Sequence, residues 1–149
     1  MYRHILVPTD GSPLSLKAAK EAAKLAKTQK AKVTAYYAIA PFVTPVMGEA
    51  LIVAPEIFSE KEYVKRMQKV ANAALTKVEA EAKKAGVAFE GASAFADEPW
   101  RGIIDAAKAN ECDLIVMASH GRRGLEGLLL GSETLKVLTH SKTPVLVCR

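Results

Sequence analysis

Cysteine is scarce in this chain of 149 residues, which contains only Cys112 and Cys148 and has no CxxC spacing. This scarcity argues against a zinc site and against a disulfide framework. A chain of this length buries roughly two-thirds of the surface that its unfolded form exposes, so its core needs neither. We therefore expect both thiols to be small apolar side chains in a protein of a reducing compartment.

Long apolar segments are absent as well. No stretch approaches the roughly 20 residues of a membrane-spanning helix. The N-terminal residues lack the basic, apolar and small-residue regions of a signal peptide. We expect a cytoplasmic protein that has no membrane partner. Neither a linker nor a repeat divides the chain, and its length fits one domain over residues 1–149.

The net charge of +5 is modest, and many lysines are spread beside glutamates along two amphipathic segments. Such runs are usually solvated helix faces. Nucleic-acid binding instead needs basic residues clustered on one face, together with aromatic side chains for stacking. Nucleic acid is therefore the disfavoured partner.

What the sequence does contain is a regular alternation of strand and helix patterns. Short apolar and β-branched runs predict strands at residues 4–8, 32–40, 87–95, 113–118 and 144–148. Helical spacing and the start signals Ser12-Pro13 and Ser59 with Glu62 predict helices at residues 13–29, 59–84, 97–110 and 132–140. Apolar strands joined by helical crossovers indicate an α/β fold: an open, doubly wound, five-stranded parallel sheet with helices on both faces.

Residues 41–58 break this pattern. They hold Pro41, Pro45, Gly48 and Pro55 among apolar residues, with no clear period. A loop this long is usually functional, mobile or both. We expect a ligand bound nearby to stabilise one conformation of it.

The chemistry of such a sheet is expected at the carboxyl ends of its strands, where the strand order reverses. The strands at residues 4–8 and 113–118 are the predicted neighbours at that point. Both are followed by segments rich in turn and polar residues, PTDGS at residues 8–12 and ASHGRRG at residues 118–124. The second segment continues to Gly131 and Ser132, where a helix begins.

The glycine-rich loop at residues 118–132 is a candidate phosphate cradle. Glycines let backbone N–H groups approach an anion and adopt positive φ, and a helix N-terminus adds donors and a favourable dipole. Ser132 could add its hydroxyl, and Arg122 and Arg123 supply fork-shaped cationic donors. The loop is neither a Walker loop nor a GxGxxG motif. On these residues alone, a flexible surface loop with turn glycines explains the pattern equally well.

Asp10 and His120 carry ambiguous chemistry. Asp10 could accept hydrogen bonds from a ribose or hold a cation, or it could cap the first helix together with Ser12. His120 could contact a phosphate or act in acid–base chemistry, although a lone loop histidine is more often merely exposed. His4 and His140 have no partners in the sequence, and we interpret both as structural.

Four segments together resemble the universal stress protein family: VPTDGS at residues 7–12, MASHG at 117–121, LGS at 130–132 and TPVLV at 143–147. The resemblance covers essentially the whole chain, with the right order and spacing. It implies a Rossmann-like, adenine nucleotide alpha hydrolase-like fold. For the ATP-binding branch of that family it also implies ATP, with Mg²⁺ or Mn²⁺, in a stress-response or regulatory protein that has little or no turnover.

The signature of that branch is glycine, two residues, glycine, nine residues, then glycine and serine or threonine. Gly121, Gly131 and Ser132 match it, and Ala118 stands where the first glycine would be. Alanine keeps its backbone N–H but disfavours positive φ and adds a methyl group near the ligand. The resemblance implies adenine and ribose contacts by Pro8, Thr9, Asp10 and the backbone of Ala38, and phosphate-side contacts by Met117, Ala118, Gly121, Gly131, Ser132 and the N–H of Glu133.

The resemblance also implies a homodimer that pairs through the last strand. A short apolar strand such as VLV at residues 145–147 invites pairing with another chain when it lies at a sheet edge. Lys142 and Arg149 could instead protect this edge. Three functions stay open: a nucleotide-binding regulatory protein, an ATPase or phosphotransferase that uses Asp10 or His120, and a dimeric interaction module without nucleotide.

Overall fold

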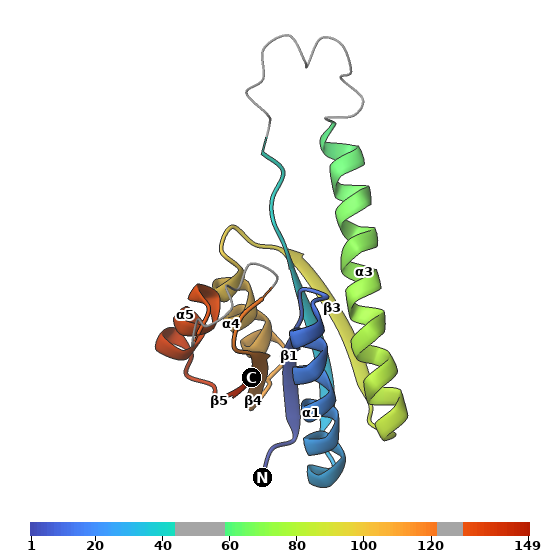
Figure 1. Cartoon of the computed structure of the whole chain (residues 1–149). Helices are drawn as coiled ribbons and strands as arrows, with labels where there is room; N and C mark the ends of the chain where they lie inside the picture. The colour runs from blue at the N-terminus through green and yellow to red at the C-terminus, as the bar shows by residue number, and fades with distance from the viewer. Residues whose placement is uncertain (44–58, 122–129) are drawn as a thin grey trace.

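The computed structural model of the chain describes residues 1–43, 59–121 and 130–149 (Figure 1). Five strands form one sheet in the order β3-β2-β1-β4-β5, and all neighbouring pairs are parallel. The strands are β1 His4–Pro8, β2 Lys32–Ile39, β3 Phe89–Phe95, β4 Leu114–Ala118 and β5 Val145–Cys148. The strand order therefore reverses between β1 and β4, as predicted.

Helices cover both faces of this sheet. On one face lie α1 (Pro13–Gln29) and α3 (Glu60–Ala85), and on the other lie α4 (Pro99–Ala109) and α5 (Ser132–His140). The predicted doubly wound α/β fold is confirmed, and the predicted elements agree with the observed ones to within a few residues. Most of the loop predicted at residues 41–58 lies outside the described residues.

Side chains of β1 alternate between two layers of core. Ile5 and Val7 are fully buried with the alanines of α1, whereas Leu6 packs with Ile103 of α4 and Val137 of α5. The residues of β4 are buried on both faces in the same way. Because β1 and β4 are enclosed on every side, their carboxyl ends are held in fixed positions.

Local signals at the helix ends match the sequence. The Ser12 hydroxyl accepts the N–H of Ser15 at 3.2 Å ahead of α1, and the Ser59 hydroxyl accepts the N–H of Glu62 at 3.2 Å ahead of α3. Gly86 follows α3 in the left-handed conformation, with φ 71°. The two serine contacts satisfy N–H groups of the first helical turn that have no acceptor within the helix.

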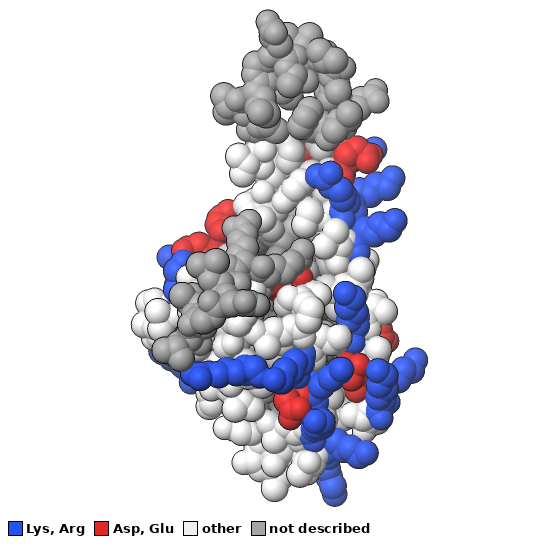
Figure 2. Space-filling model, viewed as in Figure 1, with Lys and Arg blue, Asp and Glu red and all other residues white. Residues whose placement is uncertain are grey.

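Lysine and arginine side chains lie along α1 and α3 (Figure 2). Lys24 pairs with Glu21 at 2.8 Å and Lys84 pairs with Glu81 at 2.8 Å, each on its own helix. Exposed pairs of this spacing contribute only a few tenths of a kcal/mol. The charge runs are thus solvated helix faces, as expected. Within the described residues, no helix has both the length and the apolar character needed to cross a membrane.

The titratable side chains of His4 and Cys112 are buried. The Nε2 atom of His4 lies 2.7 Å from the hydroxyl of Thr34, and His4 is 6% exposed. Burial, together with the charge of Lys32, lowers the pKa of His4. Burial also raises the pKa of the Cys112 thiol to about 11, which keeps the thiol protonated and unreactive. Cys112 and Cys148 form no disulfide.

We expect the free energy of unfolding to decrease as the pH falls from about 7.5 to about 5.5. The lowered pKa means that His4 binds a proton less readily in the folded chain than in the unfolded chain. Its contribution to stability is therefore present above a pH of about 6.5 and is lost on acidification. Urea denaturation across this range measures the effect. His4→Gln should flatten the decline, and an unchanged slope in this variant would assign the decline to other groups.

Candidate nucleotide site

The loops that follow β1 and β4 lie against each other at the carboxyl edge of the sheet. A Cβ atom placed on Gly121 would lie 2.6 Å from Oδ2 of Asp10, so the two loops are in direct contact. The contact follows from the parallel pairing of β1 with β4, whose carboxyl ends reach the same edge. Pro8, Ala38 and Met117 reach this edge as the last or next-to-last residues of β1, β2 and β4.

Thr9 holds the start of the β1 loop. Its N–H donates to the carbonyl of Tyr36 in β2 at 2.9 Å, which ties the loop to the neighbouring strand. Its hydroxyl oxygen accepts the N–H of Gly11 at 3.1 Å and lies 3.1 Å from the hydroxyl of Ser15. Because the side chain is buried and fully engaged within the protein, it shapes the loop from behind.

The carboxylate of Asp10 takes part in the start of α1, and it can still face a ligand. Its Oδ1 accepts the N–H of Ser12 at 3.0 Å, a turn bond that prepares the start of α1. Gly11, between them, has φ +78°. Oδ2 lies toward Gly121 and the β4 loop. Helix capping and a position facing the second loop are therefore compatible in one side chain.

The first turn of α5 is joined to the end of β4. Gly131 is the N-cap of α5, and its N–H donates to the carbonyl of Ser119 at 2.7 Å. The Thr134 hydroxyl donates to the carbonyl of Ala118 at 3.0 Å. The N–H groups of the first turn have no acceptor within the helix, and they form the positive end of its dipole. The helix start beside the two loops is therefore suited to an anion.

At positions 121 and 131 glycine allows neighbouring atoms to lie close to the backbone. Neither position requires the left-handed conformation. Gly131 has φ −71°, and Gly121 is not among the described glycines with positive φ. A Cβ atom on Gly131 would lie 3.1 Å from Cα of His120 and 3.4 Å from the carbonyl oxygen of Ser119. Neither glycine uses the positive φ that glycine permits. In addition, the N–H of Gly131 is used to close the loop.

Ala118 and Met117 end β4 in extended conformation. Ala118 is not among the described residues with positive φ, so the restriction that alanine places on the backbone has no effect here. The Met117 side chain is buried in the core between the sheet and α4, 5% exposed. Only the backbone of Met117 is therefore able to face the carboxyl edge.

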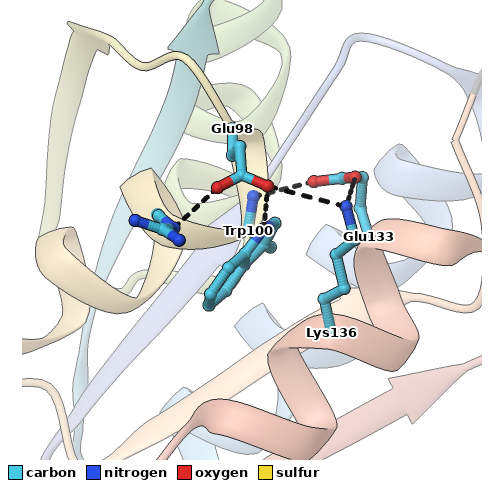
Figure 3. A network of polar contacts seen from close by, with 5 residues as sticks. Glu98, Trp100, Glu133 and Lys136 are labelled. Atoms are coloured by element: carbon cyan, nitrogen blue, oxygen red, sulfur yellow. Dashed lines mark hydrogen bonds and ion pairs between the residues drawn. The ribbon is translucent and has the colours of Figure 1, made fainter.

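The side chain of Glu133 has a role that sequence reasoning missed (Figure 3). Its Oε2 accepts the backbone N–H of Trp100 at 2.8 Å, so α5 caps the first turn of α4. Lys136 bridges Glu133 at 3.5 Å and Glu98 at 3.8 Å, and Arg101 pairs with Glu98 at 2.6 Å. The indole N–H of Trp100, with Arg101 and Lys136, holds the pKa of Glu98 below its usual range. The spacing of three residues in Glu98–Arg101 and Glu133–Lys136 was the only signal in the sequence.

The remaining polar candidates lie on the β4 loop. Nδ1 of His120 is 3.2 Å from the hydroxyl of Ser119, and His120 is half-buried. Arg122 and Arg123, predicted as cationic donors, lie outside the described residues. Within the part of the chain that the structure describes, no three His, Cys, Asp or Glu side chains gather into a metal site.

Solved structures with this fold include relatives of similar length. Protein MJ0577 of Methanocaldococcus jannaschii superposes with a TM-score of 0.77 at 28% identity, over 99% of this chain and 95% of that one. A universal stress protein solved in complex with cAMP superposes with a TM-score of 0.69 at 28% identity, over 99% of this chain and 97% of that one.

Sequence comparison reaches the same group of proteins. Universal stress protein MJ0531 of Methanocaldococcus jannaschii is 36% identical over 153 residues, which cover 100% of this chain and 83% of that protein. The family model described as "Universal stress protein family" matches residues 1–149. Sequence motifs, sheet order and these matches agree: the chain belongs to the universal stress protein family.

Proposed function

We propose that the chain binds an adenine nucleotide, and specifically ATP, at the junction of the β1 loop, the β4 loop and the first turn of α5. The observation that carries the proposal is the joining of α5 to the end of β4, which holds the first turn of α5 against the β4 loop, while Gly121 of that loop contacts Asp10. Phosphates bind such helix starts, and a carboxylate at a strand end accepts hydrogen bonds from ribose. The cAMP complex of a relative supports the choice of an adenine nucleotide.

The residues divide between the two ends of the nucleotide. Pro8 and Asp10 form the side for adenine and ribose, with the backbone of Ala38 at the end of β2, and Thr9 contributes by fixing the loop behind them. The phosphate side is formed by Gly121 and Gly131, which leave room for it, and by the backbone of Met117 and Ala118, the hydroxyl of Ser132 and the N–H of Glu133.

ATP with Mg²⁺ fits the donors present. Mg²⁺ keeps several waters and binds substrate phosphates with one or two carboxylates. Asp10 is the carboxylate that the β1 loop brings to this junction. Mn²⁺ accepts the same oxygen ligands. The ion would come with the nucleotide, since the protein does not need to supply a complete cage.

Little or no turnover is part of the proposal. In-line phosphoryl transfer needs a group that positions the nucleophile and others that stabilise the developing charge. Among the described residues of the junction, the Asp10 carboxylate holds the turn before α1 and the Glu133 carboxylate caps α4. We infer a regulatory, stress-response role in which nucleotide binding changes the conformation of the loops.

Identifying the nucleotide that co-purifies with the protein tests this function. Acid extraction followed by chromatography should release ATP, and phosphate release from added ATP should be negligible. Thermal melts with ATP, ADP, AMP and cAMP then rank the ligands. At a hundred times its Kd a ligand stabilises the folded chain by about 2.7 kcal/mol, which a melt resolves.

Two other outcomes point to the alternative functions. Rapid phosphate release that Asp10→Asn abolishes would make the chain an ATPase or phosphotransferase. No bound nucleotide, together with no thermal shift with any of the four ligands, would leave a dimeric interaction module. Either outcome contradicts the proposal.

We also propose that the chain forms a homodimer through β5. This strand is an edge of the sheet, with β4 as its one neighbour among the described strands. Leu146, in its middle, is 43% exposed. Pairing with a second β5 would satisfy the edge and cover Leu146.

A further inference from the structure

A second hollow lies away from the proposed nucleotide junction, between α4 and the edge strand β3. It has a volume of about 610 Å³. Alanines 92 and 94 of β3 form one wall, Ala106 and Ala109 of α4 form the other, and Tyr36 of β2 lies between them. Small side chains on both walls leave the hollow open. We call it the β3–α4 groove.

Tyr36 brings a polar atom to this groove. Its ring is packed in the core beside Leu6 and Ile103, and the residue is only 4% exposed. Its hydroxyl has no hydrogen-bond partner among the described residues. Every fully buried polar side-chain atom among those residues does have a partner. The Tyr36 hydroxyl is therefore not fully buried and reaches the groove surface, as expected because a buried hydroxyl without a partner is costly.

Gly102 makes room for this hydroxyl. A Cβ atom at position 102 would lie 2.5 Å from the Tyr36 hydroxyl oxygen and 2.9 Å from Cβ of Ala96. Glycine inside a helix costs about 1 kcal/mol relative to alanine. Removing the tyrosine hydroxyl would relieve the closer of these two contacts. The chain instead retains both a helix-weakening glycine and a hydroxyl that no described group uses.

The charges of the groove are unbalanced. Glu98, at one end, is neutralised by Arg101 at 2.6 Å and Lys136 at 3.8 Å. Asp97 and Asp105 also line the groove, and within the described residues neither forms an ion pair. Burial, together with the charge of Asp105, raises the pKa of Tyr36, so the hydroxyl stays protonated. The groove thus offers two uncompensated carboxylates beside a neutral hydroxyl.

We propose that the β3–α4 groove binds a small aliphatic primary amine in its ammonium form. The ammonium group donates hydrogen bonds to the Asp105 carboxylate and to the Tyr36 hydroxyl oxygen, and the hydrocarbon stem lies along the alanine walls. A bare divalent metal ion suits this site less well, because five of the fourteen lining residues are alanines and such ions prefer several oxygen ligands. A diamine places its second ammonium group toward Asp97. The site does not depend on the proposed nucleotide function.

Titration of the ¹⁵N-labelled protein with 1,4-diaminobutane tests this site. Saturable shifts are expected at the amides of Ala92, Ala94 and Ala106, at constant ionic strength. Butylamine should bind more weakly than the diamine, and Asp97→Asn should remove that difference. The neutral probe 1-butanol should give no saturable shift at the same concentration, because it lacks the charge that the carboxylates attract.

Two variants and one control assign the contacts. Asp105→Asn should weaken diamine binding about tenfold or more, since it removes a charge-assisted hydrogen bond. Tyr36→Phe should weaken it about three- to tenfold. Glu79→Gln, which removes an exposed carboxylate from α3, should leave the affinity unchanged, and thermal melts verify that each variant is folded.

Three results would overturn the proposal. The first is the absence of saturable shifts with either amine, which would mean that the groove holds only water. The second is equal binding of 1-butanol, which would mean that the groove is merely apolar. The third is a diamine affinity that responds to Glu79→Gln as strongly as to Asp105→Asn, which would mean general attraction to surface charge.

Discussion

Gly131→Val is expected to abolish the thermal stabilisation that ATP gives to the unsubstituted protein, while the chain still folds. The new Cβ atom would lie 3.1 Å from Cα of His120. The Cβ atom is fixed to the backbone of residue 131 and the Cα atom belongs to the backbone of His120, so no side-chain rotation relieves this contact. Relief of the clash moves the first turn of α5 away from the end of β4. The N–H groups of that turn are then displaced from the proposed phosphate site, and the stabilisation of about 2.7 kcal/mol expected at a hundred times the Kd is lost.

The measurement is a set of thermal melts with and without ATP. Gly91→Val is the matched control, because its Cβ atom would meet Leu75 and Phe89 at ordinary contact distances of 3.6 Å in the edge strand β3. The control should keep the full ATP shift. Overpacking at position 131 should also lower the melting temperature without ligand, by the equivalent of about 1–3 kcal/mol. A full ATP shift in Gly131→Val would show that the nucleotide binds elsewhere.

The fold was predictable because its signals are local. The apolar run at residues 4–8 and the run at 113–118 each lead into polar turns, and parallel strands with helical crossovers bring such turns to one edge. Ser12, Ser59 and Gly86 mark helix ends by chemistry that acts within a few residues. The contact between Asp10 and Gly121 follows from this topology.

The finer roles at the site were not predictable, because they depend on tertiary contacts. Glu133 caps a helix that begins 34 residues earlier in the chain, at Pro99. Nothing near Glu133 in the sequence indicates that partner. The N–H of Gly131 looks available in the sequence, yet the carbonyl of Ser119 accepts it. Ala118 departs from the family signature, but its φ is not positive, so the restriction that alanine places on the backbone has no effect there.

The α4–α5 contact helps to hold the start of α5 in place. Glu133 and Lys136 project from one side of α5 toward Glu98 and Trp100 at the start of α4 (Figure 3). Thr134 bonds to the end of β4. The first turn of α5 is therefore fixed from two directions, by the sheet and by a neighbouring helix. A ligand at this helix start meets donors that are already ordered, which lowers the entropy cost of binding.

Leu146→Lys is expected to convert the proposed dimer into monomers. In a two-fold interface through β5 the same residue is supplied by both chains, so each dimer would gain two charges in a region that becomes buried. An unpaired charge in such an interface costs several kcal/mol. The dissociation constant should rise by about 100-fold or more, which corresponds to about 2.7 kcal/mol. Leu146 is 43% exposed in the single chain, so the substitution leaves the fold of the monomer intact.

Sedimentation velocity over a range of protein concentrations measures the change, and Leu135→Lys is the matched control. Leu135 is the more exposed of the two leucines, at 54%, but it lies on α5 and not on the sheet edge. A dimer through β5 should therefore tolerate lysine at position 135 and fail with lysine at position 146. The reverse pattern would place the interface on α5. A monomer in the unsubstituted protein at every concentration would mean that Lys142 and Arg149 are sufficient to keep the β5 edge unpaired.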